Sequence, residues 1–324
     1  MAEKKAVNKV VEPTNEEIDA HVDQLVAKAQ VALSKFEEFT QEQVDYIVAK
    51  CSVAGLDAHG TLAEAAVNET GRGVFEDKAV KNLFACEYVT SNLRHLKTVG
   101  IINEDPLLGI TEIAEPVGVV CGIVPTTNPT STVIFKSLIC LKTRNPIIFS
   151  FHPSAHACSV MAAVVIRDAA IAAGAPEDCI QWLDLKSMYA TTALMKHPGV
   201  ATILATGGNA MVAAAYSCGK PALGVGAGNV PAYVEKTCVL PRAVNDIVLS
   251  KSFDNGMICA SEQAAIVDTE IYDAFMKEIK RFKVYFVNKE EKAKLETFMF
   301  GAVAYSDNVN AAKLNPNVVG KPAT

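Results

Sequence analysis

The residue of this sequence best placed for covalent chemistry is Cys259, in the segment Phe253–Gln263 (FDNGMICASEQ). Asp254–Gly256 precedes it and is typical of a turn, whereas the apolar run Ala264–Val267 after it predicts a strand. A cysteine in a loop between regular elements can present its thiolate to a substrate carbonyl. Free cysteine is more often a small buried hydrophobe, however, so a nucleophilic role depends on partner groups elsewhere in the chain.

Asn128 is a second candidate, because it lies in Pro125–Pro129 (PTTNP), just after the predicted buried strand Val117–Val124. A side-chain amide there could donate a hydrogen bond to a developing oxyanion, which contributes about 10²–10³ in rate in acyl-transfer enzymes. An Asn-Pro pair is also a common start of a turn. Spacing alone does not decide between these two interpretations, and it identifies no Ser-His-Asp arrangement or pair of carboxylates.

Two glycine segments could contact a phosphate. Thr206–Gly208 lies at a predicted strand-to-helix junction, where backbone N–H groups and the helix dipole favour an anion. Gly224, Gly226 and Gly228 form a GxGxG run, which differs from the GxGxxG dinucleotide fingerprint that belongs after the first strand of its unit. Helices also begin in this way without ligands, and a glycine run between strands often serves packing or a turn. Both interpretations therefore stay open for each segment.

His152 and His156 are four residues apart, a spacing that helical metal sites use. Pro153 directly follows His152 and places this histidine before the helix start. Neither a third histidine nor an HExxH motif occurs nearby. The sequence therefore predicts no metal site.

The first hundred residues are predicted to be mostly helical. Thr14–Glu17, Thr40–Gln43 and Thr61–Glu64 each have the form of a capping box, which marks a helix start. Apolar residues follow at helical spacing. The helical pattern continues, with interruptions, to about Leu96.

Beyond residue 110 the pattern alternates between strand and helix with short connections, which is typical of βαβ units on a parallel sheet. The predicted strands are 117–124, 146–151, 179–183 and 200–205, and the predicted helices are 130–141, 155–173, 187–196 and one opened by residues 206–208. Such sheets bind ligands beyond the C-terminal ends of their strands. Asn128, His152 and Gly207 all follow predicted strands, so we expect them at the same edge.

Composition restricts the class of protein. The chain has 324 residues, half of them hydrophobic, with a net charge of −6 and a mean hydropathy of +0.20, which favours a large buried core over disorder. It has no basic block, no secretory signal and no run of about 18 uncharged apolar residues, so we expect no nucleic-acid or membrane partner. The nine cysteines contain no CxxC pair, so we expect a reducing cytoplasm rather than a disulfide framework.

Five blocks of the sequence resemble the aldehyde dehydrogenase superfamily and occur in its order. They are GIVPTTNPTSTVIFK, KTRNPIIFSFHPSA, ILATGGNAMVAAAYSCGKPALGVGAGN, FDNGMICASEQ and FMFGAVA. More narrowly, the chain is similar to the CoA-acylating acetaldehyde dehydrogenase half of the bacterial bifunctional aldehyde-alcohol dehydrogenase. The resemblance implies an α/β fold with a Rossmann-like parallel sheet flanked by helices, plus the start of a second α/β catalytic domain.

The resemblance also implies a role for each candidate residue. Cys259 would be the nucleophile, and Asn128 and the backbone N–H of Cys259 would form the oxyanion hole. The residues implied in the NAD site are Ile123, Val124, Pro125, Thr126, Thr127, Asn128, Gly208 and Gly226, with Gly207 and His152 as further neighbours of the dinucleotide.

The implied reaction interconverts acetaldehyde, CoA and NAD with acetyl-CoA and NADH through a thioacyl intermediate on Cys259, within fermentative ethanol metabolism. Gly224–Asn229 (GVGAGN) departs from the hydrolytic members, which place a water-activating glutamate in an ELGG-type motif there. This departure favours CoA over water as the acyl acceptor. The expected partners are therefore the aldehyde and CoA, and a homo-oligomer is expected as well.

The family's domain extends past a position equivalent to Thr324, where it contributes a glutamate to the nicotinamide ribose and an oligomerising segment. Full-length bifunctional relatives also carry an iron-dependent alcohol dehydrogenase domain. We therefore expect an unpaired sheet edge and an exposed apolar face. The predicted division is a flexible N-terminal arm (1–13), a helical region with the NAD-binding domain (14–239) and an incomplete catalytic domain (240–324).

Two alternatives stay open. The chain could be a truncated, non-catalytic fragment for nucleotide binding or assembly. It could also be an acylating dehydrogenase for a longer aldehyde, because the sequence pattern does not define the size of the substrate pocket.

Overall fold

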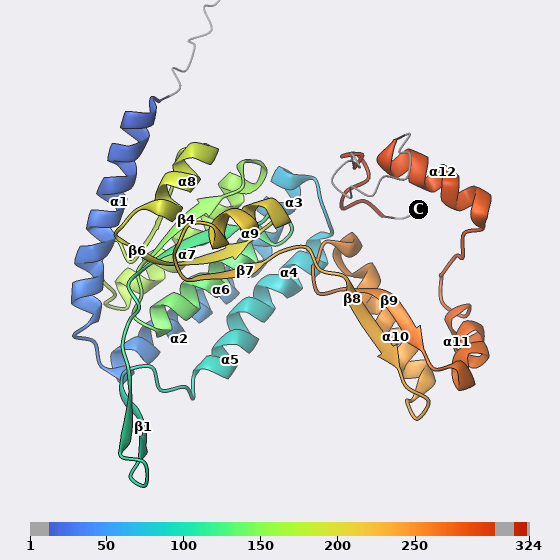
Figure 1. Ribbon diagram of the computed structural model, residues 1–324, viewed down its shortest axis with the longest axis horizontal. Coiled ribbons are helices and arrows are strands. Elements are labelled where there is room, and N and C mark those ends of the chain that lie inside the picture. The colour runs from blue at the N-terminus through green and yellow to red at the C-terminus, as the bar shows by residue number, and fades with distance from the viewer. Residues whose placement is uncertain (1–12, 302–313, 323–324) are drawn as a thin grey trace, which may run out of the picture.

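The computed structural model describes residues 13–301 and 314–322 and centres on a five-stranded parallel sheet (Figure 1). In spatial order its strands are β5 (Ile180–Trp182), β4 (Ile147–Phe151), β3 (Val119–Val124), β6 (Val200–Thr206) and β7 (Ala222–Val225). Every neighbouring pair is parallel. From β3 the chain continues to β4 and β5 on one side of β3, and then to β6 and β7 on its other side. An open α/β sheet forms its ligand crevice at such a reversal of strand order, here between β3 and β6. The predicted Rossmann-like α/β fold is confirmed.

Two helical layers bury both faces of this sheet. Val120 and Val124 of β3 pack with one layer, and Val119, Cys121 and Ile123 pack with the other, as the alternation of side chains along a strand requires. The helices of the first layer are α2 (Gln41–Asp57), α6 (Pro129–Lys142) and α7 (His156–Ala172), and those of the second are α1 (Asn15–Phe36) and α8 (Met188–Lys196).

Two of the three predicted helix starts are confirmed. Thr14 and Thr40 are the N-cap residues of α1 and α2, and each forms a complete capping box. The third prediction, at Thr61, is wrong, because α3 (His59–Thr70) has Ala58 as its N-cap residue and no side-chain cap. Ala58 also ends α2, so the two helices adjoin and Thr61 falls inside α3. The predicted N-terminal arm lies almost entirely outside the described residues.

The helical region continues to about the predicted point. It contains α4 (Phe75–Leu83), a π-helical turn (Phe84–Tyr88) and α5 (Val89–Leu93). A hairpin follows in which β1 (Gly100–Asp105) pairs antiparallel with β2 (Ile110–Ala114). The sequence pattern did not predict β1. Both strands are largely exposed, and the hairpin projects from the body of the molecule (Figure 1).

A smaller α/β unit follows the main sheet. β8 (Val230–Val234) pairs in parallel with β9 (Glu262–Val267), and one face of this pair packs on α10 (Leu240–Ser252) and α11 (Tyr272–Ile279). The last helix among the described residues is α12 (Lys289–Phe300). β8 precedes residue 240 yet shares a sheet with β9, and the division of the chain at residue 240 stays a prediction.

The other face of the β8–β9 pair carries exposed apolar side chains. Tyr233 and Ile266 are register partners on the two strands and are 64% and 55% exposed. Within the part of the chain that the structure describes, this sheet has two strands, so each strand has an unpaired edge. Both observations agree with the expected apolar face and sheet edge.

In the part of the chain that the structure describes, one helical segment, Pro153–Ala172, is long and apolar enough to cross a membrane by length and composition alone, with a mean hydropathy of 1.5. It combines a 3-10 turn (Pro153–Ala155) with α7, which packs against α2, α3 and α6. A helix that covers one face of a buried sheet has the same composition. The packing of α7 therefore accounts for its apolar character.

Candidate active site

A cavity of about 490 Å³ opens at the C-terminal ends of β3, β4, β6 and β7. The predicted cofactor-site residues that line it are Ile123, Val124, Pro125, Thr126, Thr127, His152, Gly207, Gly208 and Gly226. Cys259 and Gln263 reach the same cavity from the smaller α/β unit. The structure thus brings the predicted nucleophile to the strand ends that a parallel sheet uses for ligands. The roles of these residues stay predictions.

Cys259 is exposed and occupies the turn between a 3-10 turn (Phe253–Gly256) and β9, as predicted. Gln263 Nε2 donates a hydrogen bond to the carbonyl of Gly228 at 3.1 Å. A Cβ at Gly228 would lie 3.8 Å from the carbonyl oxygen of Cys259. The glycine run before β8 therefore borders the nucleophile turn.

The remaining cysteines are poor nucleophile candidates. Six of the nine are buried, and Cys218 and Cys238 are partly exposed. Burial raises the pKa of the Cys121 and Cys140 thiols to about 12, so both stay protonated near neutral pH. Exposure and position in the cavity together single out Cys259.

The N-terminus of α9 (Asn209–Tyr216) borders the cavity through its N-cap residue, Gly208. No side chain caps the first N–H groups of this helix, and a Cβ at Gly208 would meet no atom within 4 Å. At Gly226, by contrast, a Cβ would lie 2.7 Å from Asn209 Oδ1, which accepts a hydrogen bond from the N–H of Ala227. Free N–H groups beside open space at a helix N-terminus fit a phosphate group.

Asn128 lies next to the cavity rather than among the residues that line it. Its Oδ1 accepts a hydrogen bond from Lys81 Nζ at 2.7 Å, and its Nδ2 donates to Thr127 Oγ1 at 3.1 Å. Lys81 Nζ also donates to the carbonyl of Met257 at 2.6 Å. Met257 precedes Cys259 by two residues. One ammonium group therefore joins the predicted oxyanion donor to the nucleophile turn.

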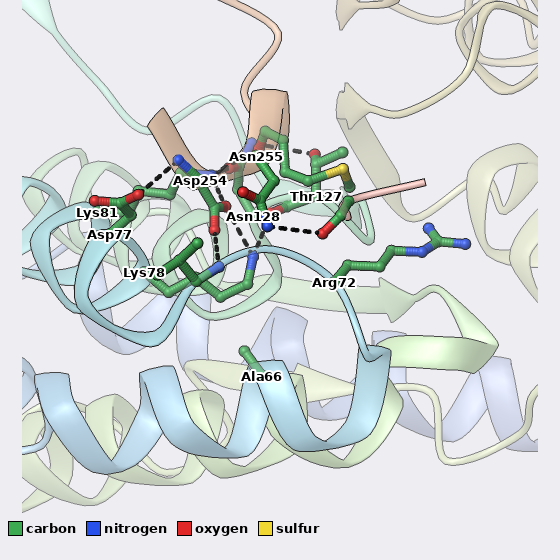
Figure 2. A network of polar contacts seen from close by, with 12 residues as sticks. Ala66, Arg72, Asp77, Lys78, Lys81, Thr127, Asn128, Asp254 and Asn255 are labelled. Atoms are coloured by element: carbon green, nitrogen blue, oxygen red, sulfur yellow. Dashed lines mark hydrogen bonds and ion pairs between the residues drawn. The ribbon is translucent and has the colours of Figure 1, made fainter. Parts of the chain in front are cut away.

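A buried carboxylate holds the same network together (Figure 2). Asp254 Oδ2 accepts from Lys78 Nζ at 3.0 Å and from Lys81 Nζ at 2.5 Å, and its Oδ1 accepts from the N–H of Val74. The backbone φ of Asp254 is +51°, in the left-handed region. Gly73 comes so close that a Cβ there would lie 2.0 Å from Oδ1, so this position requires glycine. Burial lowers the pKa of Lys81 to about 8, and the Asp254 carboxylate opposes that shift.

Sequence reasoning missed Lys78 and Lys81 and assigned Asp254 only to a turn. The available signal was the i, i+3 spacing of the two lysines, which places them on one face of α4. A lysine pair on a helix usually marks a solvated face, so this signal alone would not have identified a buried network.

Comparison with known proteins shows which family the chain belongs to. Residues 3–311 match the model of the aldehyde dehydrogenase family. The chain belongs to this family. It is 70% identical over 305 residues to aldehyde-alcohol dehydrogenase 2 of Entamoeba histolytica, which covers 94% of this chain and 35% of that protein. The chain spans about a third of the length of the curated relatives it matches.

Solved structures of aldehyde dehydrogenases have the same architecture. An acetylating aldehyde dehydrogenase from Geobacillus thermoglucosidasius has a TM-score of 0.87 and 45% identity, covering 96% of this chain and 67% of its own. Propionaldehyde dehydrogenase of Rhodopseudomonas palustris, solved with bound CoA and an acylated cysteine, has a TM-score of 0.79 and 30% identity, covering 93% and 67%.

His152 lines the cavity and, as predicted, lies before the helix start, next to the 3-10 turn. Its Nδ1 accepts a hydrogen bond from the N–H of Ser154. Burial and the nearby Arg72 guanidinium lower the pKa of His152, and Arg72 itself donates to Thr126 Oγ1 at 3.0 Å. Among residues 13–301 and 314–322, no group of three or more His, Cys, Asp or Glu side chains is arranged to hold a metal.

Lys136 ties together the two strands that flank the crevice. Its Nζ donates to the carbonyl of Ile123 in β3 at 2.7 Å and to the carbonyl of Leu204 in β6 at 2.6 Å. Burial lowers the pKa of Lys136 to about 7. This lysine therefore fixes the spacing of the strand ends from which the cavity is built.

Proposed function

We propose that this chain is a CoA-acylating acetaldehyde dehydrogenase domain that uses NAD, as part of a bifunctional aldehyde-alcohol dehydrogenase of fermentative ethanol metabolism. The observation that carries the proposal is the exposed thiol of Cys259 in one cavity with the uncapped N-terminus of α9. The similarity to aldehyde-alcohol dehydrogenases and to an acetylating aldehyde dehydrogenase supports the substrate class.

Cys259 and Asn128 would carry out the covalent chemistry. The Cys259 thiolate attacks the carbonyl carbon of acetaldehyde, an S–C bond forms, and the C=O electron pair moves to oxygen. The amide of Asn128 and the N–H of Cys259 donate hydrogen bonds to this oxyanion. The oxyanion re-forms C=O as hydride leaves the carbon, and a thioester remains on Cys259. The thiolate of CoA then attacks the thioester, and Cys259 leaves as a thiolate.

The residues around the crevice fit a dinucleotide. NAD, when bound, supplies the hydride acceptor for the oxidation step. Thr206–Gly208 and the free N–H groups of α9 would hold its phosphates, because an uncapped helix N-terminus favours anions and a Cβ at Gly208 would meet no atom within 4 Å. Ile123–Thr127 lines the same cavity at the end of β3, at the strand-order reversal where dinucleotides bind in such sheets.

CoA is the favoured acyl acceptor for two reasons. Hydrolysis would need a carboxylate to activate water, and no Asp or Glu is among the described residues that line the cavity. In addition, a propionaldehyde dehydrogenase of the same architecture has been solved with CoA and an acylated cysteine. We further infer a reducing compartment such as the cytoplasm, which suits nine free cysteines, and assembly into a homo-oligomer.

NADH formation from acetaldehyde and NAD, with and without CoA, tests this function. Without CoA we expect at most one NADH per Cys259, because the thioester stays on the enzyme; with CoA we expect continuous NADH formation, which falls about 10³-fold or more in Cys259→Ala. Cys238→Ala, at a partly exposed cysteine outside the cavity, should keep the wild-type rate. Equal rates without CoA would show that water is the acceptor. NAD binding without any turnover would favour a nucleotide-binding fragment instead.

A further inference from the structure

The ammonium group of Lys81 uses all of its hydrogen-bond donors at the active site. A lysine ammonium has three N–H donors and no acceptor. Lys81 Nζ donates to Asn128 Oδ1 at 2.7 Å, to the carbonyl of Met257 at 2.6 Å and to Asp254 Oδ2 at 2.5 Å. The side chain is only 7% exposed, so water does not compete for these donors.

The contact with Lys81 determines which way the amide of Asn128 points. Because the ammonium can only donate, the atom of Asn128 that faces it must be the carbonyl oxygen. The NH₂ group is therefore directed away from Lys81. One of its hydrogens bonds Thr127 Oγ1, on a residue that lines the cavity, and no group among the described residues accepts the other, which leaves it for an oxyanion. Without Lys81, either end of the amide could take this position.

The same ammonium also holds the chain that leads into Cys259. Two of its three acceptors, Asp254 and Met257, lie within the five residues before the nucleophile. Asp254 keeps a left-handed backbone conformation while its carboxylate bonds Lys78 and Lys81 from α4. The position of the turn is therefore coupled to the orientation of the oxyanion donor.

We propose that Lys81 is a positioning residue, which orients the amide of Asn128 and the turn before Cys259 relative to each other. This role rests on the proposed function of the same site. It differs from the roles of the reacting groups, because Lys81 would act through Asn128 and the turn rather than on substrate.

Single-turnover acylation of Cys259 by p-nitrophenyl acetate tests this role without NAD or CoA. The thiolate attacks the ester carbonyl, an S–C bond forms, and p-nitrophenolate leaves with the electrons of the broken C–O bond. The tetrahedral oxyanion formed on the way needs the same donors as the aldehyde adduct. Failure of CoA-dependent NADH formation would therefore overturn the proposed function while this reaction still reports on Lys81.

The rate of acylation should be measured in Lys81→Met, Asn128→Ala and the double variant. We expect each single variant to be about 10²-fold slower, and the double variant to be close to the slower single one, because Lys81 acts through Asn128. The half-saturating ester concentration should change little. Effects that multiply to about 10⁴-fold in the double variant would overturn the proposal.

Lys142→Met is the matched control for lost stability. Lys142 is another buried lysine with one carboxylate partner, Asp45, and it lies outside the cavity. This variant should unfold more easily yet keep the wild-type rate of acylation. A rate in Lys81→Met equal to that in Lys142→Met would also overturn the proposal, as would a wild-type chain that the ester does not acylate on Cys259.

A second pair of variants tests the contact if Lys81→Met does not fold. Asn128→Leu leaves a donor of Lys81 without a partner, whereas Asn128→Asp offers it a carboxylate of the same shape. We expect Asn128→Asp to melt about 3 °C or more above Asn128→Leu, although both lack the amide and are acylated slowly. Equal melting temperatures would show that Lys81 does not depend on this acceptor.

Discussion

Two lysines near the cavity, Lys81 and Lys136, are both buried but bond different kinds of acceptor. Lys81 has the Asp254 carboxylate as a partner, whereas Lys136 is held by the carbonyl oxygens of Ile123 and Leu204. Burial disfavours the charged form of both, so their pKa values fall to about 8 and about 7. Near neutral pH, Lys136 therefore sits close to the midpoint of its titration in the folded protein.

The lowered pKa of Lys136 makes stability depend on pH. The ordinary value of 10.5 applies when the chain unfolds, and the folded value is about 7. Between them the unfolded chain binds one more proton, so the free energy of unfolding should rise with pH by up to about 1.4 kcal/mol per unit. Lys136→Met should lose this contribution.

Urea unfolding between about pH 7 and about pH 9 measures the effect. Wild type should gain more stability than Lys136→Met as the pH rises. Lys28→Met, at an exposed side chain, controls for the loss of a positive charge and should follow wild type. Equal slopes for wild type and Lys136→Met would contradict the assignment.

Local chemistry explains which site residues could be predicted from sequence. Cys259 stands out because turn residues precede it and a strand follows, and Gly208 stands out because it joins a strand to a helix. The pairing of Lys81 with Asp254 spans 173 residues, and each charge alone resembles a solvated surface group. Only the folded structure brings them together and removes them from water.

At the scale of elements, the N-terminus of α9 carries the most direct prediction about the cofactor. The backbone of Gly208 has an ordinary φ of −68°, and a Cβ there would meet no atom within 4 Å. Gly208→Ala should therefore leave the fold intact and change stability by no more than about 1 kcal/mol. If NAD phosphates approach this helix end, the added methyl group should weaken NAD binding about 10-fold or more.

Calorimetric titration of NAD, with thermal unfolding alongside, checks this expectation. Gly60→Ala is the matched control, since a Cβ there also meets no atom within 4 Å and the residue lies in α3, outside the cavity. It should bind NAD like wild type. Unchanged NAD affinity in Gly208→Ala would place the dinucleotide elsewhere.

Element boundaries were predictable where a local signal decided them. Thr14 and Thr40 start helices because the residue three positions on completes a capping box. Thr61 has the same signal, but α2 ends so late that α3 begins before it. The strand β1 (GIINED) was missed because its largely exposed residues show no alternation of apolar and polar side chains, and its pairing with β2 alone makes it a strand.

At the scale of the whole molecule, the order of the main sheet follows from its βαβ units, whereas the β1–β2 hairpin does not. An isolated two-stranded hairpin is only marginally stable in water. Leu107 and Leu108 at its tip are 95% and 72% exposed, and Ile113 is exposed as well. A second copy of the chain, as expected for a homo-oligomer, would bury these side chains.

Replacing both Leu107 and Leu108 with Asp should therefore reduce self-association, because it places charges in the contact. Sedimentation velocity over a range of concentrations measures this change. Leu249→Asp, at an exposed leucine of α10, is the control and should sediment like wild type. A wild-type chain that sediments as a monomer throughout, or a double variant that matches it in assembly, would contradict the expectation.

The most direct test of the account is mass spectrometry of the Cys259 peptide after incubation with acetaldehyde and NAD in the absence of CoA. We expect one acetyl group on Cys259, which is removed when CoA is added and appears as acetyl-CoA. An acetyl group that leaves at the same rate without CoA would show that water is the acceptor. An unmodified Cys259, or an acetyl group on another cysteine, would contradict the central claim that this thiol carries the acyl group.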